Sequence, residues 1–112
     1  MRPIRLTVTG VGQTDPVPLD MYLNPFNVSI RALLSPNPGA TYTVEYTESD
    51  VWAADYDPDT DTWNALAGMD GAVDDAYTTL VSPVTAVRMR VTAVNAPTDS
   101  AELVVLQSGA VS

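Results

Sequence analysis

Apolar and polar residues alternate with a period of two in four segments of this chain, a pattern typical of strands with one buried and one solvated face. The clearest example is VRMRVTA, in which apolar Val87, Met89 and Val91 alternate with Arg88 and Arg90. The four segments are residues 4–9, 26–34, 41–47 and 84–94. Weaker patterns predict strands at residues 17–23, 78–81 and 101–107. We therefore expect about seven short strands.

Turn-forming residues, mainly proline and glycine, separate these segments and favour a fold made of β-sheets. The stretch SPNPGA at residues 35–40 predicts a turn, because proline presets φ and glycine accepts a positive φ. No segment has the 3.6-residue period of an amphipathic helix, and within residues 61–72 we allow at most one helical turn. We predict an all-β protein, a single antiparallel β-sandwich over residues 1–112. It is immunoglobulin-like or jelly-roll-like, and a small barrel is the alternative.

Composition narrows the classes of function. The chain has a formal net charge of −9, its five basic residues are all arginines, and it contains no Cys, His or Lys. So acidic a domain is repelled by phosphate backbones, and we expect no nucleic-acid partner. No apolar run approaches ~20 residues, and the start MRPIRLTVTG lacks an apolar core, so we expect neither a membrane partner nor a secretory signal. Without His, Cys or Lys the serines lack the usual activating bases, so we do not expect an enzyme.

Residues 48–77 form a long acidic loop insertion between two of the predicted strands. They contain eight aspartates, both tryptophans and no basic residue. Long loops in compact domains are usually functional or mobile. The loop is therefore the first place to look for a binding site.

Aspartates occupy every second position in DYDPDTDTW. They are Asp55, Asp57, Asp59 and Asp61. Alternating oxygen ligands suit calcium, but Thr60 stands where the helix-loop-helix calcium motif needs glycine, and Leu66 stands where it needs a bidentate glutamate. We reject that motif and expect no cofactor, with a less regular Ca²⁺ site as the alternative. The preferred interpretation is an exposed, mutually repelling loop tip that favours solubility.

Three aromatic residues accompany the aspartates. Trp52 and Trp63 flank the acidic run, and Tyr56 lies inside it. Loop aromatics can stack on sugars or anchor a protein partner. The preferred interpretation is that both tryptophans fold back onto the sandwich, with Trp63 anchoring the loop, and the sugar or partner platform is the alternative.

Two predicted strands are apolar on both faces. If Leu103 and Val105 face the core, Val104 and Leu106 point away from it, and Leu33 does the same in its own strand. Apolar residues on an outward sheet face are explained by a surface that a partner or a second copy covers, or alternatively by cover from strand ends and local loops. We therefore list Leu33, Val104 and Leu106 as candidate partner-binding residues.

Four arginines are predicted on outward strand faces. They are Arg5, Arg31, Arg88 and Arg90. Pairing across strands with a glutamate such as Glu45 or Glu102 is one interpretation. Contact with an acidic partner surface is the other, and Arg88 and Arg90 on the strongest strand are its candidates.

Several segments, taken in order, resemble a group of small structural proteins of tailed bacteriophages. They are LTVTGVGQT, PLDMYLNPFNVSIRALL, TYTVEYTESDVW, the Thr62–Trp63 pair, SPVTAVRMRVTAV and LVVLQSG. The resemblance implies a non-enzymatic β-sandwich on the capsid surface of the virion, made in the host cytoplasm. It implies a decoration (cement) protein bound to the major capsid protein, either alone or as a homo-oligomer such as a trimer or dimer. A head-fibre or tail-associated receptor- or glycan-binding module is the alternative. The group brings no catalytic residues and no metal motif.

Overall fold

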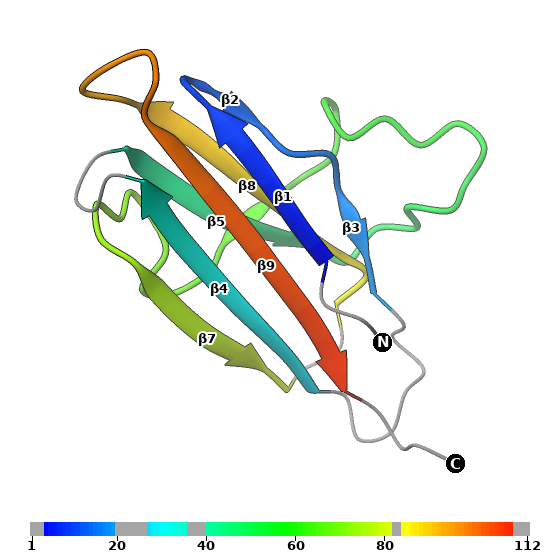
Figure 1. The fold of residues 1–112 in the computed structure, drawn as a ribbon. Helices are drawn as coiled ribbons and strands as arrows, with labels where there is room; N and C mark the ends of the chain where they lie inside the picture. The colour runs from blue at the N-terminus through cyan, green and yellow to red at the C-terminus, as the bar shows by residue number, and fades with distance from the viewer. Residues whose placement is uncertain (1–3, 20–26, 36–39, 82–83, 109–112) are drawn as a thin grey trace.

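The computed structural model describes residues 4–19, 27–35, 40–81 and 84–108 (Figure 1). They form nine strands and no helix. The strands are β1 (Ile4–Thr9), β2 (Gly12–Gln13), β3 (Val17–Pro18), β4 (Asn27–Ser35), β5 (Thr41–Thr47), β6 (Asn64–Ala65), β7 (Ala76–Leu80), β8 (Ala86–Ala93) and β9 (Ser100–Ser108). No helix in the described part of the chain is long and apolar enough to cross a membrane.

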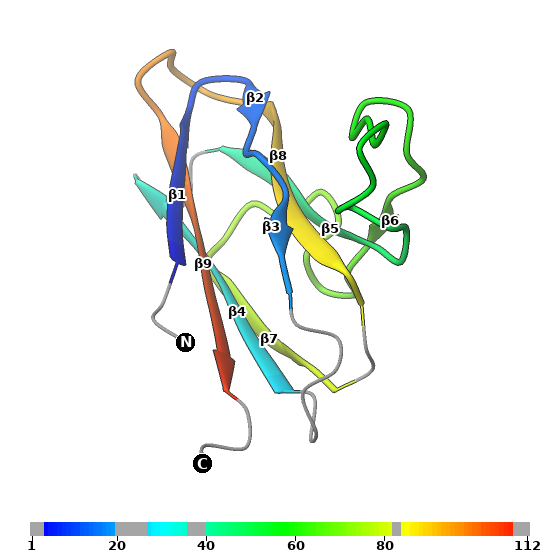
Figure 2. The same cartoon turned by 90° about the vertical axis from the view of Figure 1, so that its right-hand side faces the viewer.

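Two antiparallel sheets pack face to face, which confirms the predicted β-sandwich (Figure 2). The first sheet has the strand order β1-β9-β4-β7. The second has the order β2-β8-β5-β6, and β3 also pairs with β8. Strands β4 and β9 form the longest ladder, running from Asn27 opposite Ser108 to Ser35 opposite Ser100. The two sheets form separate layers, unlike the closed barrel that was the alternative.

The core lies between the inner faces of the two sheets. Along β4, buried Val28, Ile30, Ala32 and Leu34 alternate with more exposed residues, as the period-two pattern predicts. The same alternation in the other long strands buries Tyr42, Val44, Val87, Met89, Val91, Leu103 and Val105. This core fixes the register of each long strand, because a shift by one residue would turn its apolar side chains to the other face.

The boundaries of the weaker elements differ from those expected. The strand predicted at residues 78–81 begins earlier, at Ala76. Residues 61–72, for which the sequence allows at most one helical turn, contain the two-residue strand β6 followed by turns. Of the strand predicted at residues 17–23, only Val17–Pro18 is a strand, and residues 20–23 lie outside the described part. Residues 36–39 of the predicted turn also lie outside it.

The outer face of the second sheet is covered, contrary to the prediction of a solvated face. Thr43, Glu45, Thr47 and Arg88 point outward from β5 and β8, yet each is at most 7% exposed. The long loop that follows β5 lies on this side of the sandwich (Figure 2). A strand under a polar loop has the same sequence pattern as a strand facing water, because the polar groups pair within the protein.

Candidate functional site

No segment of the described part of the chain covers the outer face of the first sheet in this way. This sheet lies in front in Figure 1, and the long loop lies on the far side of the sandwich. We call this surface the open face and define it by six outward-directed residues of β1, β9, β4 and β7. They are Arg5, Arg31, Leu33, Tyr77, Val104 and Leu106.

Strand pairing places four of these residues in one row across the sheet. Arg5 lies opposite Val104, Val104 opposite Arg31, and Arg31 opposite Tyr77. Arg5 also forms an ion pair with Glu102, with 2.9 Å between Nη1 and Oε1. The row therefore alternates cationic groups with apolar and aromatic side chains.

Exposure varies along the open face. Tyr77 is 80% exposed and Leu106 is 38% exposed, whereas Val104 is only 7% exposed between its neighbours. Two shallow hollows border Arg31, one of about 250 Å³ beside Val104 and one of about 140 Å³ beside Leu33. The open face therefore offers a partner two hollows, with cationic Arg31 between them.

The structure brings together three of the five predicted partner-binding residues. Leu33, Val104 and Leu106 all lie on the open face. Arg88 and Arg90 do not, because β8 belongs to the second sheet. Arg88 is buried, so its proposed contact with an acidic partner is wrong. Its alternative assignment, pairing with Glu45, is confirmed.

Arg88 belongs to a buried polar row on the outer face of the second sheet. Its Nε lies 3.1 Å from Glu45 Oε1, and its Cζ lies 4.2 Å from the centre of the Trp63 ring. Arg90 approaches the other oxygen of Glu45 at 3.6 Å, and its side chain remains 47% exposed. A guanidinium between a carboxylate and an indole face is held by charge and by the ring quadrupole together.

The three loop aromatics have different environments. The indole Nε1 of Trp63 donates to the Pro58 carbonyl within the loop at 2.9 Å, and its ring lies against Arg88, which ties the loop to the sheet. The Tyr56 hydroxyl donates to Asp61 at 2.7 Å. Trp52 is 54% exposed. A sugar platform made of all three rings would need their faces free, and Arg88 occupies one face of Trp63.

Asp61 is a structural acceptor, so the interpretation of the whole acidic run as an exposed tip is wrong at this residue. Its carboxylate accepts hydrogen bonds from the hydroxyls of Thr47, Ser49 and Tyr56 and from the Thr62 amide, at 2.5–2.8 Å. Burial alone would raise the pKa of Asp61, but these hydrogen bonds outweigh burial and lower its pKa below the usual value of 3.8.

The other three aspartates of the run are exposed and do not converge with Asp61. Asp57 caps its own turn by accepting from the Asp59 amide at 2.9 Å, and Asp59 accepts from Gln13 at 3.5 Å. Among the described residues, no group of three or more acidic side chains is placed to hold a metal ion. The geometry thus gives no support to the irregular calcium site considered above.

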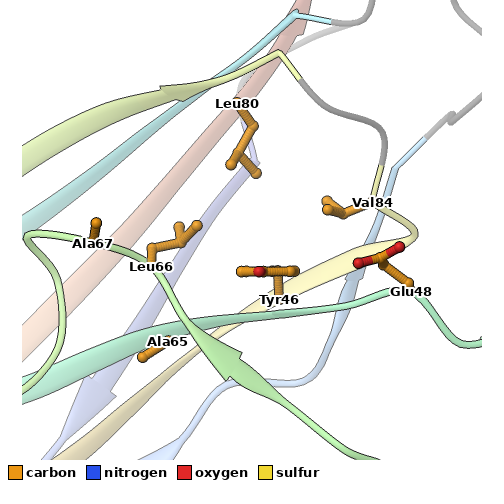
Figure 3. A pocket seen from close by; sticks show the side chains of 7 residues that line it. All are labelled: Tyr46, Glu48, Ala65, Leu66, Ala67, Leu80 and Val84. Carbon is orange, nitrogen blue, oxygen red and sulfur yellow. The ribbon is translucent and has the colours of Figure 1, made fainter.

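A cavity of about 610 Å³ lies between the two sheets near the end of β7 (Figure 3). Its lining is Tyr46, Glu48, Ala65, Leu66, Ala67, Leu80 and Val84. Most of these side chains are apolar, and Glu48 is the one carboxylate among the lining residues described. Paired acid and base groups, which a hydrolytic site needs, are not present among them.

Two tyrosines should ionise late in an alkaline titration. Burial and the nearby carboxylates raise the pKa of Tyr42 to about 12, and burial and the hydrogen bond to Asp61 raise that of Tyr56 to about 12. Because both values are raised, the two hydroxyls stabilise the fold fully below pH 10 and lose this effect as the pH approaches 12. The amplitude of the late rise in absorbance near 295 nm should correspond to two tyrosines in the wild type and to one in Tyr56→Phe. An unchanged amplitude would contradict the Tyr56–Asp61 contact.

No family model, curated protein or solved structure matches the chain. The open face and the long loop are therefore the features of the molecule that bear on its function. Sequence reasoning missed Tyr77 because it placed the start of that strand at residue 78. It noted Arg5 and Arg31 as outward-facing without separating them from the arginines of the second sheet.

Proposed function

We propose that this chain is a non-enzymatic structural protein of a bacteriophage virion, a decoration protein that binds the outer surface of the assembled head. The observation that carries the proposal is the open face. Leu33, Val104 and Leu106 meet there beside Arg31 and Tyr77, and arginine and tyrosine are residue types enriched at protein interfaces.

The distribution of charge supports docking by this face. The chain carries a net charge of −9, yet the open face presents Arg5 and Arg31 with Glu102 as the acidic partner of Arg5. The long acidic loop lies on the opposite side of the sandwich (Figure 2). An approaching acidic surface is attracted to one side of the molecule and repelled by the other, which orients the encounter.

A repetitive shell suits a patch of this modest size. Each contact involves only a few side chains of one four-stranded sheet. A repetitive shell offers many equivalent binding sites to monomers or oligomers, and linked copies gain avidity without new contacts. The major capsid protein is the proposed partner.

The test is co-sedimentation of the purified chain with assembled heads that lack it, compared with unassembled capsid subunits. We expect binding to heads alone, and binding that weakens as salt is raised. Arg31→Gln should weaken binding about fivefold, because it removes the central cation of the row.

Arg90→Gln is the matched control. It also removes one partly exposed arginine, but from the second sheet, and should leave head binding within about twofold of wild type. Equal losses in the two variants would point to net charge instead of the open face. Failure of the wild type to pellet with heads of its own phage would reject the proposed function.

A further inference from the structure

Among the residues that the structure describes, strand β7 is an uncovered edge of the first sheet. It pairs with β4 on one side, and no described element lies on its other side (Figure 1). Its sequence AYTTL contains no charged residue and no proline, the usual means by which proteins protect an exposed edge. The described edges of the second sheet are strands of only two residues, which is itself a protection.

The backbone groups of β7 that face outward can be assigned. The Leu34 amide donates to the Asp75 carboxylate at 2.7 Å, so the inward-facing residues of β4 direct their backbone groups toward β7. Alternate residues of a strand direct these groups to opposite sides. The ladder to β4 therefore uses Ala76, Thr78 and Leu80, while Tyr77 and Thr79 direct N–H and C=O to the free edge.

We propose that β7 pairs with β7 of a second copy of this chain, antiparallel about a two-fold axis at Thr78. In this register Tyr77 forms a hydrogen-bonded pair with Thr79 of the second copy, and Thr79 with Tyr77. Ala76 lies opposite Leu80, and Thr78 faces Thr78 in a non-hydrogen-bonded pair. All five residues of the strand are then paired, and the two free edges are removed together.

Self-pairing fits the side chains and charges around the edge. Tyr77, 80% exposed in the single chain, packs beside a threonine across the new ladder, a favourable cross-strand combination. Val81, 71% exposed, comes opposite Asp75, so no like charges meet. The two Asp75 carboxylates are about 20 Å apart, six residues of strand, which exceeds the Debye length in physiological salt.

The pairing joins two open faces into one continuous eight-stranded surface. It follows from the edge and its register, and it does not depend on what the open face binds. A five-residue ladder is a small interface, so the dimer fraction should rise with protein concentration over a roughly hundredfold range.

Cysteine cross-linking tests both the pairing and its register, since the chain has no cysteine of its own. In Thr78→Cys the two thiols meet in a non-hydrogen-bonded pair with Cα atoms about 4.5 Å apart, within disulfide range. Oxidation should convert most of this variant to a covalent dimer. In the control Thr79→Cys the equivalent atoms are diagonal, about 7–8 Å apart, and should cross-link at least tenfold more slowly.

Sedimentation velocity of the intact chain gives the second readout. Thr79→Pro removes an N–H that points to the free edge and leaves the ladder to β4 complete, so it should abolish the dimer while the circular dichroism spectrum stays that of a β-sheet protein. A wild type that remains monomeric throughout, or a Thr79→Cys variant that cross-links as fast as Thr78→Cys, would overturn the proposal. Capture of an extended peptide by a monomeric wild type would overturn it equally.

Discussion

Arg88→Met is expected to lower the free energy of unfolding by about 3–5 kcal/mol, a large part of the total stability of a domain of this size. The substitution keeps the length of the side chain and removes its charge. Glu45, itself only 7% exposed, then loses the guanidinium at 3.1 Å and keeps only the longer contact to Arg90. A buried carboxylate without a good partner is among the few causes of such large effects.

The loss of stability should come mainly from leaving the Glu45 carboxylate buried without its partner, and less from the lost attraction between Glu45 and Arg88. Replacing both members of a buried ion pair by uncharged groups is often close to neutral. The double variant Arg88→Met with Glu45→Gln should therefore recover at least about half of the stability that Arg88→Met loses. Trp63 contributes as well, because its ring stacks on the same guanidinium at 4.2 Å.

Urea unfolding followed by circular dichroism measures each free energy. Arg90→Met is the control on the same strand, since its side chain is 47% exposed and its contact to Glu45 is longer, and it should cost less than about 1 kcal/mol. A loss below about 1 kcal/mol in Arg88→Met, or a double variant less stable than the single one, would contradict the inference that an unpaired Glu45 carboxylate destabilises the fold.

The long strands and the open face were largely predictable from the sequence. Period-two alternation located β1, β4, β5 and β8, because core burial fixes which face each side chain takes, and a weaker apolar pattern located β9. The same rule placed Leu33, Val104 and Leu106 on an outward face. It could not say that they share one sheet, because sheet membership depends on which strands pair, and that is a non-local property.

The covered face of the second sheet was not predictable in this way. Polar Thr43, Glu45 and Arg88 alternate with apolar residues as they would on a solvated strand. These polar side chains can be buried because residues distant in the sequence provide them with contacts, for example the Trp63 ring over Arg88. One sign was present in the sequence: the loop carries two tryptophans, and a tryptophan ring gains from packing against an apolar or cationic group, as Trp63 does.

Asp61→Asn is expected to cost about 2–3 kcal/mol near neutral pH, because hydrogen bonds to a charged acceptor are the strong ones. Three hydroxyls and one amide donate to this carboxylate. An asparagine replaces one of the two acceptor oxygens by a donor, so Thr47 and Tyr56 would have to turn their hydroxyls elsewhere. Asp55→Asn makes the same change of charge at an exposed position of the same run and should stay within about 0.5 kcal/mol of wild type.

The loss of unfolding free energy in Asp61→Asn should also depend on pH and should become smaller in acid. The folded-state pKa of Asp61 lies below its unfolded value of 3.8, so its contribution is complete above that pH and is lost as the pH falls through the folded value. Urea unfolding at a series of pH values should show wild type and Asp61→Asn converging in acid. A difference that persists undiminished in strong acid would contradict the lowered pKa.

The local consequence can be followed with one fluorophore. In a Trp52→Phe background Trp63 is the only tryptophan left, since the chain has two. Asp61 connects Thr47 and Ser49 at the end of β5 to Tyr56 in the loop, and that loop places Trp63 over Arg88. Protonation of Asp61 should therefore free Trp63 and shift its emission to the red before β8 and β5 separate. Emission that changes only together with global unfolding would mean that the loop and the sheet it covers form a single cooperative unit.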